Sequence, residues 1–177
     1  MTGRAAMQGF VQIYTGDGKG KTTAALGLAL RAAGAGLRVY FGQFIKNGDY
    51  SELTGLARFA DCITVAQSGL GRFVGREPAP ADREAAQRGL QAIRRALVSG
   101  AYDLVIGDEA NVAASRALID EAALLELIDL RPPQVELVLT GRGAPAVVLA
   151  RADLVTEMRA VRHYYDRGVA ARVGIEK

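Results

Sequence analysis

The amino-acid sequence predicts an α/β protein: a parallel sheet flanked by helices, with a phosphate-loop (RecA-like) nucleotide-binding fold. Short apolar runs alternate with longer helical stretches, which is typical of parallel strands joined by crossover helices. A glycine-rich stretch, residues 15–23, separates the first apolar run from the first helical one. Polar residues follow several of the apolar runs, and in a parallel sheet these positions meet at the edge where ligands bind.

The expected elements follow from apolar periodicity and from the residues that interrupt it. Glycines separate the first helix from the second strand, and Pro132 and Pro133 end the fourth helix. Asp82 is expected to cap the third helix or to lie in its first turn. Strands are expected over residues 10–14, 37–41, 63–66, 104–107, 135–139 and 154–156. Helices are expected over residues 21–35, 51–60, 83–99, 120–130 and 145–151.

Length and composition predict one domain over residues 1–177, with no disulfide framework. The single cysteine, Cys62, lies in an apolar run and is expected to be a buried thiol. Lys plus Arg minus Asp plus Glu is 22 − 19, or +3, spread along the chain, which a phosphorylated small molecule explains without nucleic acid. No apolar run reaches the ~18 residues of a membrane span, and residues 1–9 lack a signal-type apolar core, so we expect a cytoplasmic protein.

The stretch at residues 15–23, Thr-Gly-Asp-Gly-Lys-Gly-Lys-Thr-Thr, has the composition of a loop that cradles a polyphosphate at a helix N-terminus. Lys21 supplies a positive charge, and Thr22 supplies a hydroxyl able to ligate Mg²⁺. Three glycines let the backbone turn and bring its N–H groups to phosphate oxygens: Gly16, Gly18 and Gly20. The usual loop begins with glycine, whereas this one begins with Thr15, which indicates phosphates placed differently from those of ordinary ATPases.

Three further positions follow predicted strands. Asp108 and Glu109 match the carboxylate that holds Mg²⁺ in phosphate-loop sites, and alternation along a strand means that only one of them faces the metal directly. Which of the two does so stays open. Arg142 is placed either to bind a phosphate or to lie in a solvated turn, and Lys46 either serves an anionic ligand or has no role in the site.

Two aromatic positions have opposite expectations. Phe73 lies in a glycine-rich loop with Val74 and either covers an apolar ligand or packs into the core. His163 is the only histidine, so it cannot form a metal cluster, and it is expected to be a surface or packing residue. The chain offers no Ser/His/Asp or Cys/His nucleophile set.

Taken together, the sequence resembles the ATP:corrinoid adenosyltransferase family of cobalamin biosynthesis, from about residue 10 to the last residue. A threonine at the first position of the phosphate loop is the pattern of that family. Gly107 departs from it because an apolar residue is usual there, and Ala110 departs because Ile or Leu is common there. The chain also has no Trp, which some members carry in the glycine-rich loop. The segments that carry the resemblance are residues 15–23, 44–46, 102–106, 108–109, 139–142, 152–158 and 174–176.

The resemblance implies that a corrinoid reduced to Co(I) attacks the 5′ carbon of ATP and that inorganic triphosphate leaves. It implies Mg²⁺ ligands at Thr22 and at Asp108 or Glu109, and catalytic roles for Lys21, Glu109 and Phe73, the last keeping water off the lower face of the cobalt. Lys19 and Arg142 are expected to add positive charge along the triphosphate. The expected ATP contacts are Thr15, Gly16, Asp17, Gly18, Lys19, Gly20, Lys21, Thr22, Thr23, Lys46 and Arg142.

The resemblance also implies a homodimer, and a separate electron donor is needed because the sequence has no flavin or iron–sulfur motif. Two other functions fit parts of the sequence. A phosphate-loop ATPase or kinase would share Lys21, Thr22 and the carboxylates but release ADP. A nucleotide-dependent binding module would use the same loop without chemistry. The preferred corrinoid, and a role in synthesis or in salvage, are left open.

Overall fold

The computed structural model describes residues 7–71 and 78–177, and it confirms the predicted α/β class. The strands are β1 Val11–Thr15, β2 Val39–Gln43, β3 Ile63–Gln67, β4 Leu104–Asp108, β5 Glu136–Thr140 and β6 Leu154–Glu157. The α-helices are α1 Lys21–Gly34, α2 Ser51–Leu56, α3 Pro80–Val98, α4 Ala110–Ser115, α5 Glu121–Leu130 and α6 Ala146–Leu149. Two 3₁₀ turns, η1 Ala57–Phe59 and η2 Tyr164–Arg167, complete the described elements.

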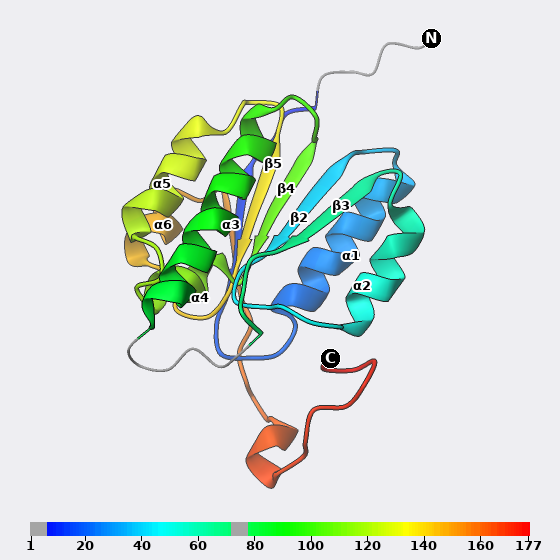
Figure 1. Ribbon diagram of the computed structural model, residues 1–177, viewed down its shortest axis with the longest axis vertical. Helices are drawn as coiled ribbons and strands as arrows, with labels where there is room; N and C mark the ends of the chain where they lie inside the picture. Colours follow the sequence, from blue (N-terminus) through cyan, green and yellow to red (C-terminus); the bar gives the residue numbers. More distant parts are fainter. Residues whose placement is uncertain (1–6, 72–77) are drawn as a thin grey trace.

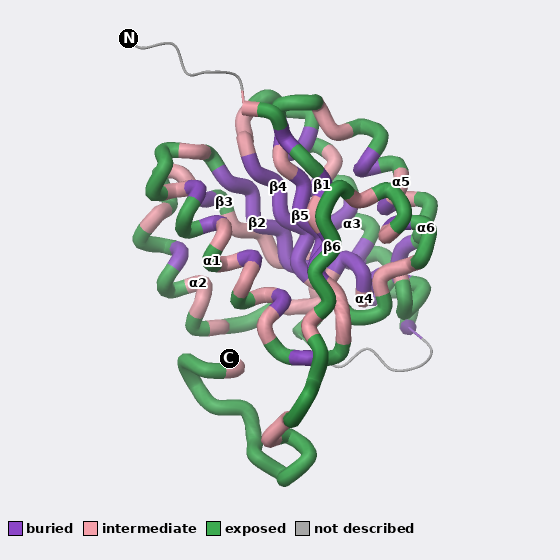
Figure 2. The backbone as a smooth tube through the Cα atoms, turned by 180° about the vertical axis from the view of Figure 1, so that it is seen from behind, coloured by how far each residue is buried: buried purple, intermediate pink, exposed green. Residues whose placement is uncertain are grey.

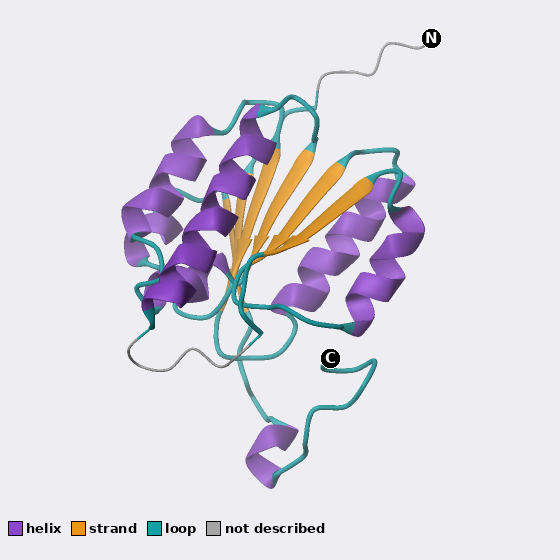
Figure 3. Cartoon of the chain, viewed as in Figure 1, coloured by secondary structure: helices purple, strands orange, loops and turns teal. Residues whose placement is uncertain are grey.

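The strands form one six-stranded sheet in the order β3-β2-β4-β5-β1-β6, and every pairing is parallel. Helices cover both faces, with α1 and α2 on one side and α3 to α6 on the other (Figures 1 and 3). A separate hydrophobic core fills the space on each side. Buried alanines such as Ala25 and Ala29 let α1 pack close to the sheet, while Ile93 and Leu97 of α3 fill the opposite core.

The strand order decides which side chains meet at the carboxyl edge of the sheet. β5 lies between β1, which leads into the phosphate loop, and β4, which ends in Asp108. Thr140 at the end of β5 is therefore placed between the loop and the carboxylate. All five residues of β4 are buried, so the end of this strand is held by the core on both faces.

The edge strand β6 is exposed where β4 is buried: all four of its residues are exposed. Figure 2 shows this strand in the colour of exposed residues along its length. Beyond it, residues 158–177, which we name the tail segment, extend past the carboxyl edge of the sheet and turn back toward α2 (Figure 1). Large apolar side chains are exposed on β6 and on the tail segment: Leu154, Val155, Val161, Tyr165, Val169, Val173 and Ile175.

Several element boundaries differ from those expected from sequence. β2 begins two residues later because Gly36 adopts a φ of 73° and the Leu37 N–H closes onto Ala32 O. The strand also ends later than expected, at Gln43. The helix expected over residues 51–60 ends at Leu56 and continues as the turn η1. α4 and η2 were not predicted at all.

Two smaller expectations are settled by contacts. Asp82 lies in the first turn of α3, where its carboxylate accepts a hydrogen bond from Ala79 N at 3.0 Å. Cys62 is half-buried rather than buried, because it precedes β3 in a turn where its thiol donates to Phe59 O. Within residues 7–71 and 78–177 no helix is long and apolar enough to cross a membrane.

Candidate functional site

The phosphate loop connects β1 to α1 through backbone conformations that favour glycine. Gly16 has a φ of 91° and Gly20 a φ of 127°, both in the region that L side chains avoid. A Cβ atom at Gly16 would lie 2.4 Å from the carbonyl oxygen of Met158. The loop therefore packs directly on the chain that follows β6. Thr15 contacts a second segment, residues 141–145 between β5 and α6, because its hydroxyl accepts a hydrogen bond from Ala144 N at 3.4 Å.

Lys21 is folded into this loop. Its Nζ donates to Gly16 O at 2.5 Å and to Gly18 O at 2.7 Å, and the residue is only 7% exposed. Burial lowers the pKa of Lys21, the charge of Arg142 lowers it further, and Glu109 is the largest opposing influence. A desolvated ammonium group in the centre of the loop is strongly attracted to an anion placed there.

The backbone N–H of Gly18 makes a hydrogen bond within the protein. Gly18 N donates to Met158 O at 2.7 Å. The sequence pattern predicted that loop N–H groups face phosphate oxygens, and this one instead anchors the loop to the tail segment. Met158 thus holds the loop through its backbone, a role that the sequence did not reveal.

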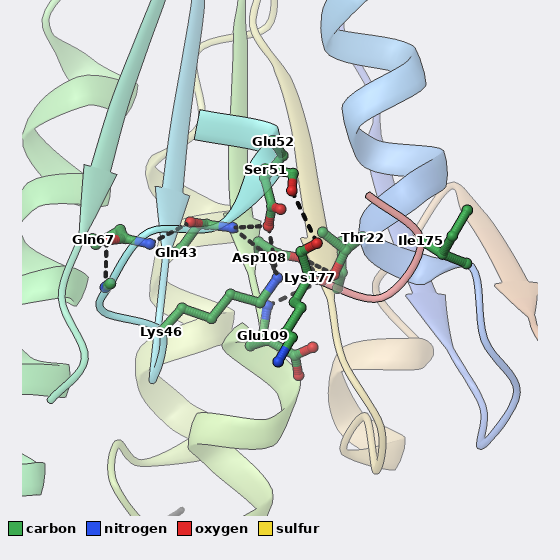
Figure 4. A network of polar contacts seen from close by, with 12 residues as sticks. Thr22, Gln43, Lys46, Ser51, Glu52, Gln67, Asp108, Glu109, Ile175 and Lys177 are labelled. Carbon is green, nitrogen blue, oxygen red and sulfur yellow. Dashed lines mark hydrogen bonds and ion pairs between the residues drawn. The ribbon is translucent and has the colours of Figure 1, made fainter. Parts of the chain in front are cut away.

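Asp108 is the centre of a buried polar network (Figure 4). Its Oδ1 accepts hydrogen bonds from the hydroxyls of Thr22 at 2.9 Å and Thr140 at 2.7 Å. Its Oδ2 accepts from Lys46 Nζ at 3.1 Å and Gln43 Nε2 at 3.3 Å. The carboxylate is fully buried, and these four donors compensate its charge. The structure therefore connects Asp108, and not Glu109, to the hydroxyl of Thr22.

Lys46 bridges two carboxylates at this edge. Its Nζ lies 3.1 Å from Asp108 Oδ2 and 3.5 Å from Glu52 Oε1. Burial lowers the pKa of Lys46, but the charge and hydrogen bond of Asp108, followed by Glu52, outweigh it, so the net pKa is raised. Lys46 is therefore charged at neutral pH. Glu52 was missed from sequence because it lies on a helix with no motif around it.

A chain of amide hydrogen bonds orients Gln43 toward this network. Gly48 N donates to Gln67 Oε1 at 3.2 Å, and Gln67 Nε2 donates to Gln43 Oε1 at 3.0 Å. The remaining Nε2 group of Gln43 then faces Asp108 and Glu52. Gln43 is 1% exposed, so the orientation of its amide is fixed by these partners. Figure 4 shows the side chains from β2, β3 and β4 converging in this way.

Glu109 differs from its neighbour in conformation and in charge environment. It adopts a left-handed φ of 61° at the start of α4, with its N–H donating to Thr140 Oγ1 at 3.0 Å. The residue is half-buried. Burial raises the pKa of Glu109, and the charge of Asp108 raises it further, while Lys46, Lys21 and Arg142 oppose the rise. The left-handed turn lets both carboxylates lie near the same cations.

The other predicted site residues lie around the loop. Asp17, Lys19 and Thr23 are exposed on it or on the first turn of α1, and Arg142 is exposed on the turn after β5. Phe73 lies outside the described residues. His163 precedes η2, where its Nδ1 accepts a hydrogen bond from Tyr165 N at 3.1 Å, in agreement with a packing role.

Comparison with known proteins identifies the family. The model of the family described as ATP:corrinoid adenosyltransferase BtuR/CobO/CobP matches residues 7–176. The chain belongs to this family. Corrinoid adenosyltransferases from Escherichia coli K12 (34% identity over 96% of this chain and 86% of the relative) and Pseudomonas aeruginosa (31%, 96% and 84%) are similar to it. The chain is thus an enzyme that transfers the adenosyl group of ATP to a corrinoid in cobalamin biosynthesis or salvage.

A solved structure supports the fold independently. The flagellar accessory protein FlaH from Methanocaldococcus jannaschii superposes with a TM-score of 0.59, covering 85% of this chain and 71% of that chain. The sequences are 11% identical, so the likeness shows the fold alone. It agrees with the RecA-like arrangement predicted from the order of strands and helices.

Proposed function

We propose that residues 1–177 form one ATP-binding domain in which the carboxyl edge of the sheet transfers the 5′-deoxyadenosyl group of ATP to the Co(I) centre of a reduced corrinoid. The observation that carries the proposal is the phosphate loop with Lys21 folded into it, next to the hydrogen bond from Thr22 to Asp108. In the reaction, the electron pair of Co(I) forms the Co–C5′ bond. The C5′–O5′ bond breaks, triphosphate leaves with O5′, and cobalt ends as Co(III).

The residues of the site then have the task of stabilising negative charge on the leaving triphosphate. Lys21 moves from the loop carbonyls to phosphate oxygens, and Arg142 approaches from the turn after β5. Lys19 adds charge at the outer side of the loop, while Asp17 and Thr23 flank the phosphates. No side-chain nucleophile takes part because cobalt is the nucleophile. Charge held in place before the reaction is the main way in which such a leaving group is stabilised.

The residues at this edge fit Mg²⁺, although the described residues hold no group of three or more His, Cys, Asp or Glu side chains arranged around a metal. Hard oxygen donors are what Mg²⁺ prefers, and it is usually held by one or two protein oxygens plus phosphates and water. Thr22 and Asp108, joined by a hydrogen bond of 2.9 Å, supply that donor set. We therefore assign the metal to Thr22 and Asp108, where the bound ion would neutralise triphosphate charge.

Glu109, Lys46 and Phe73 receive the remaining roles. Glu109 lies in the field of Lys46, Lys21 and Arg142, the cations that are also proposed to act on ATP, so it orients Lys21. It would be a second carboxylate for water bound to Mg²⁺. Lys46 pairs with the carboxylate of Asp108, and it contributes to the field that attracts ATP. Phe73 is the residue that we propose to exclude water from the lower face of the corrinoid.

The protein is further proposed to be a cytoplasmic homodimer supplied with electrons by a separate reductase. The exposed apolar residues Leu154 and Val155 on the edge strand β6 support a second copy as their cover. Light scattering of the purified protein tests the dimer. Replacement of both residues by Ser should then yield a monomer, since the apolar area that a partner would cover is removed.

The function is tested by anaerobic incubation of the protein with ATP, Mg²⁺ and a chemically reduced corrinoid. The proposal requires a light-sensitive adenosylated corrinoid together with inorganic triphosphate. Formation of ADP and phosphate, with an unchanged corrinoid spectrum, would instead establish an ATPase. ATP binding without any product in the presence of reduced corrinoid would indicate a binding module.

A further inference from the structure

The two lysines of the phosphate loop are held by different parts of the chain. Lys21 is buried and donates to the carbonyls of the loop itself. Lys19 has a side chain 38% exposed, and its ammonium group reaches the tail segment. Its Nζ donates to Ile175 O at 2.9 Å and lies 3.8 Å from Glu176 Oε1. Ile175, 156 positions later in the chain, thus holds Lys19, the lysine on the outer side of the loop.

Glu176 is itself firmly held. Its Oε2 accepts from Arg172 N at 2.9 Å and Arg172 Nε at 3.2 Å, while Oε1 accepts from Arg172 Nη2 at 3.2 Å and from the hydroxyl of Tyr164. The Arg172 guanidinium also lies 5.0 Å from the centroid of the Tyr164 ring. These hydrogen bonds, those from Arg172 first, lower the pKa of Glu176 to about 2. The carboxylate is therefore ionised and oriented at neutral pH.

The last residue of the tail segment contacts the opposite side of the site. Ser51 Oγ, at the start of α2, donates to Lys177 O at 3.0 Å. Ser51 is adjacent to Glu52, which contacts Lys46 in the Asp108 network. Figure 4 draws Ile175 and Lys177 in the same view as the Asp108 network, with the hydrogen bond between Ser51 and Lys177. Residues 172–177 therefore contact both the phosphate loop and α2.

We propose that Glu176 is a positioning residue, which holds Lys19 at the outer side of the phosphate loop so that its ammonium group meets the triphosphate of ATP. The inference rests on the proposed function, because it takes the loop as the triphosphate site. Lysine loses rotamer entropy when its side chain is immobilised. Contacts with Ile175 O and Glu176 restrict the side chain before ATP arrives, so less of this cost falls on binding.

The charges favour positioning over competition with ATP. Glu176 carries one negative charge, and it contacts two positive groups, Arg172 and Lys19, so the cluster is net positive. Lys19 has three N–H donors, and within the described residues one hydrogen bond, to Ile175 O, is made. The 3.8 Å approach to Glu176 is longer than a hydrogen bond. Donors of Lys19 are therefore available to phosphate oxygens without breaking the contact with Ile175.

The test is titration calorimetry of ATP binding without corrinoid, which does not depend on adenosyl transfer. Glu176→Gln should weaken ATP binding by about three- to fivefold, the size of effect expected for a partly exposed ion pair. Asp166→Asn is the matched control, since it removes one negative charge from the same segment and should leave the dissociation constant unchanged. If Glu176→Gln binds ATP as tightly as the unmodified protein, or more tightly, positioning is wrong.

A double-mutant cycle separates positioning from a purely structural role. Lys19→Met alone should weaken ATP binding, and Glu176→Gln should have no additional effect in the Lys19→Met background. Additive losses would show that Glu176 does not act through Lys19. Inorganic triphosphate should show the same pattern as ATP, whereas adenosine binding should not change. If the unmodified protein bound no ATP at all, the proposed function itself would fail, which is a different outcome from an absent coupling.

Discussion

The two sides of the phosphate site are built in opposite ways. On one side, Asp108 ends a fully buried strand and receives four side-chain hydrogen bonds from three other elements or their adjoining turns. On the other side, the loop is bounded by an edge strand with every residue exposed and by a tail segment that touches it through Met158, Ile175 and Glu176. The core fixes the position of Asp108 on one side, and solvent-accessible contacts fix the position of the loop on the other.

The two sides should therefore contribute differently to the stability of the fold. Removing a buried, hydrogen-bonded charge lowers stability strongly, because its former partners stay buried without it. Exposed ion pairs are worth about 0–1 kcal/mol. Substitutions at the interior side should therefore lower both stability and activity. Substitutions of charged side chains at the exposed side should alter ATP affinity and leave the fold nearly unchanged.

The largest effect is expected at Lys21, which belongs to neither side but lies between them. Lys21→Ala should lower turnover by about 100-fold or more, because a cation aimed at the leaving triphosphate is removed. Arg31→Ala, at the other end of α1, is the control for loss of positive charge from the same helix. Anaerobic adenosylation assays measure both. Unchanged turnover in Lys21→Ala would show that the loop does not hold the triphosphate.

Asp108→Asn tests the interior side. The amide places N–H donors against Thr22 and Thr140 or against Lys46 and Gln43, and it removes the charge that Lys46 balances. We expect the free energy of unfolding to fall by about 3 kcal/mol, together with nearly complete loss of activity. Urea denaturation provides the first measurement. A variant as stable as the unmodified protein would contradict the contrast between the two sides.

Gly18→Ala tests the contact between the loop and the tail segment. A Cβ at this position would lie 2.7 Å from Met158 O and 2.7 Å from the carbonyl carbon of Arg159, so the backbone must shift. Overpacking of this kind costs about 1–3 kcal/mol, and ATP binding should weaken because the loop moves. Gly27→Ala is the matched control: it meets nothing within 4 Å and should stabilise α1 by up to about 1 kcal/mol. Equal effects of the two substitutions would refute the contact.

Glu109→Gln should raise stability while lowering activity. Burial, followed by the charge of Asp108, raises the pKa of Glu109, so the folded state binds this proton more tightly than the unfolded chain. The stability from this proton is complete below the unfolded-state pKa of about 4.3, and it is lost as pH rises through the folded-state pKa. The variant should therefore melt at a higher temperature at pH 7. The difference from the unmodified protein should vanish near pH 4, and its persistence there would refute the assignment.

The smallest effect is expected at His163. Its side chain accepts a hydrogen bond from Tyr165 N within the tail segment. His163→Ala should leave kcat within about twofold, as for a surface residue that does not touch substrate. A large loss of kcat in a folded variant would show that the tail segment contributes more to catalysis than the positioning of Lys19.

The strands and helices that are bounded by clear signals could be predicted from sequence. The proline pair at residues 132–133 and the glycines of the phosphate loop indicated the element ends to within a residue or two. The start of β2 was wrong because Leu37 looks like a strand residue, and only the left-handed turn at Gly36 excludes it. α4 was missed because Glu109 starts it from a left-handed conformation that is rare for a non-glycine residue.

The candidate site was predictable only in its sequence-local parts. The phosphate loop and the Asp108–Glu109 pair have recognisable spacing, whereas the proposed choice of Asp108 over Glu109 rests on the hydrogen bond from Thr22 to Asp108, which only the folded chain brings together. Glu52 contacts Lys46 from a different element, and the contact of Glu176 with Lys19 joins distant parts of the chain. Both are pairings of exposed or half-buried charges. Nothing in the local sequence distinguishes such charges from an ordinary solvated surface.

The central claim is that this site breaks the bond between C5′ and O5′ of ATP. The most direct test uses ATP carrying ¹⁸O at the 5′ position, incubated anaerobically with the protein, Mg²⁺ and a reduced corrinoid, with the products analysed by mass spectrometry. Attack by cobalt at carbon predicts that the label leaves in inorganic triphosphate and that the corrinoid gains an unlabelled 5′-deoxyadenosyl group. Recovery of the label in ADP, AMP or adenosine would show attack at phosphorus and would contradict the account.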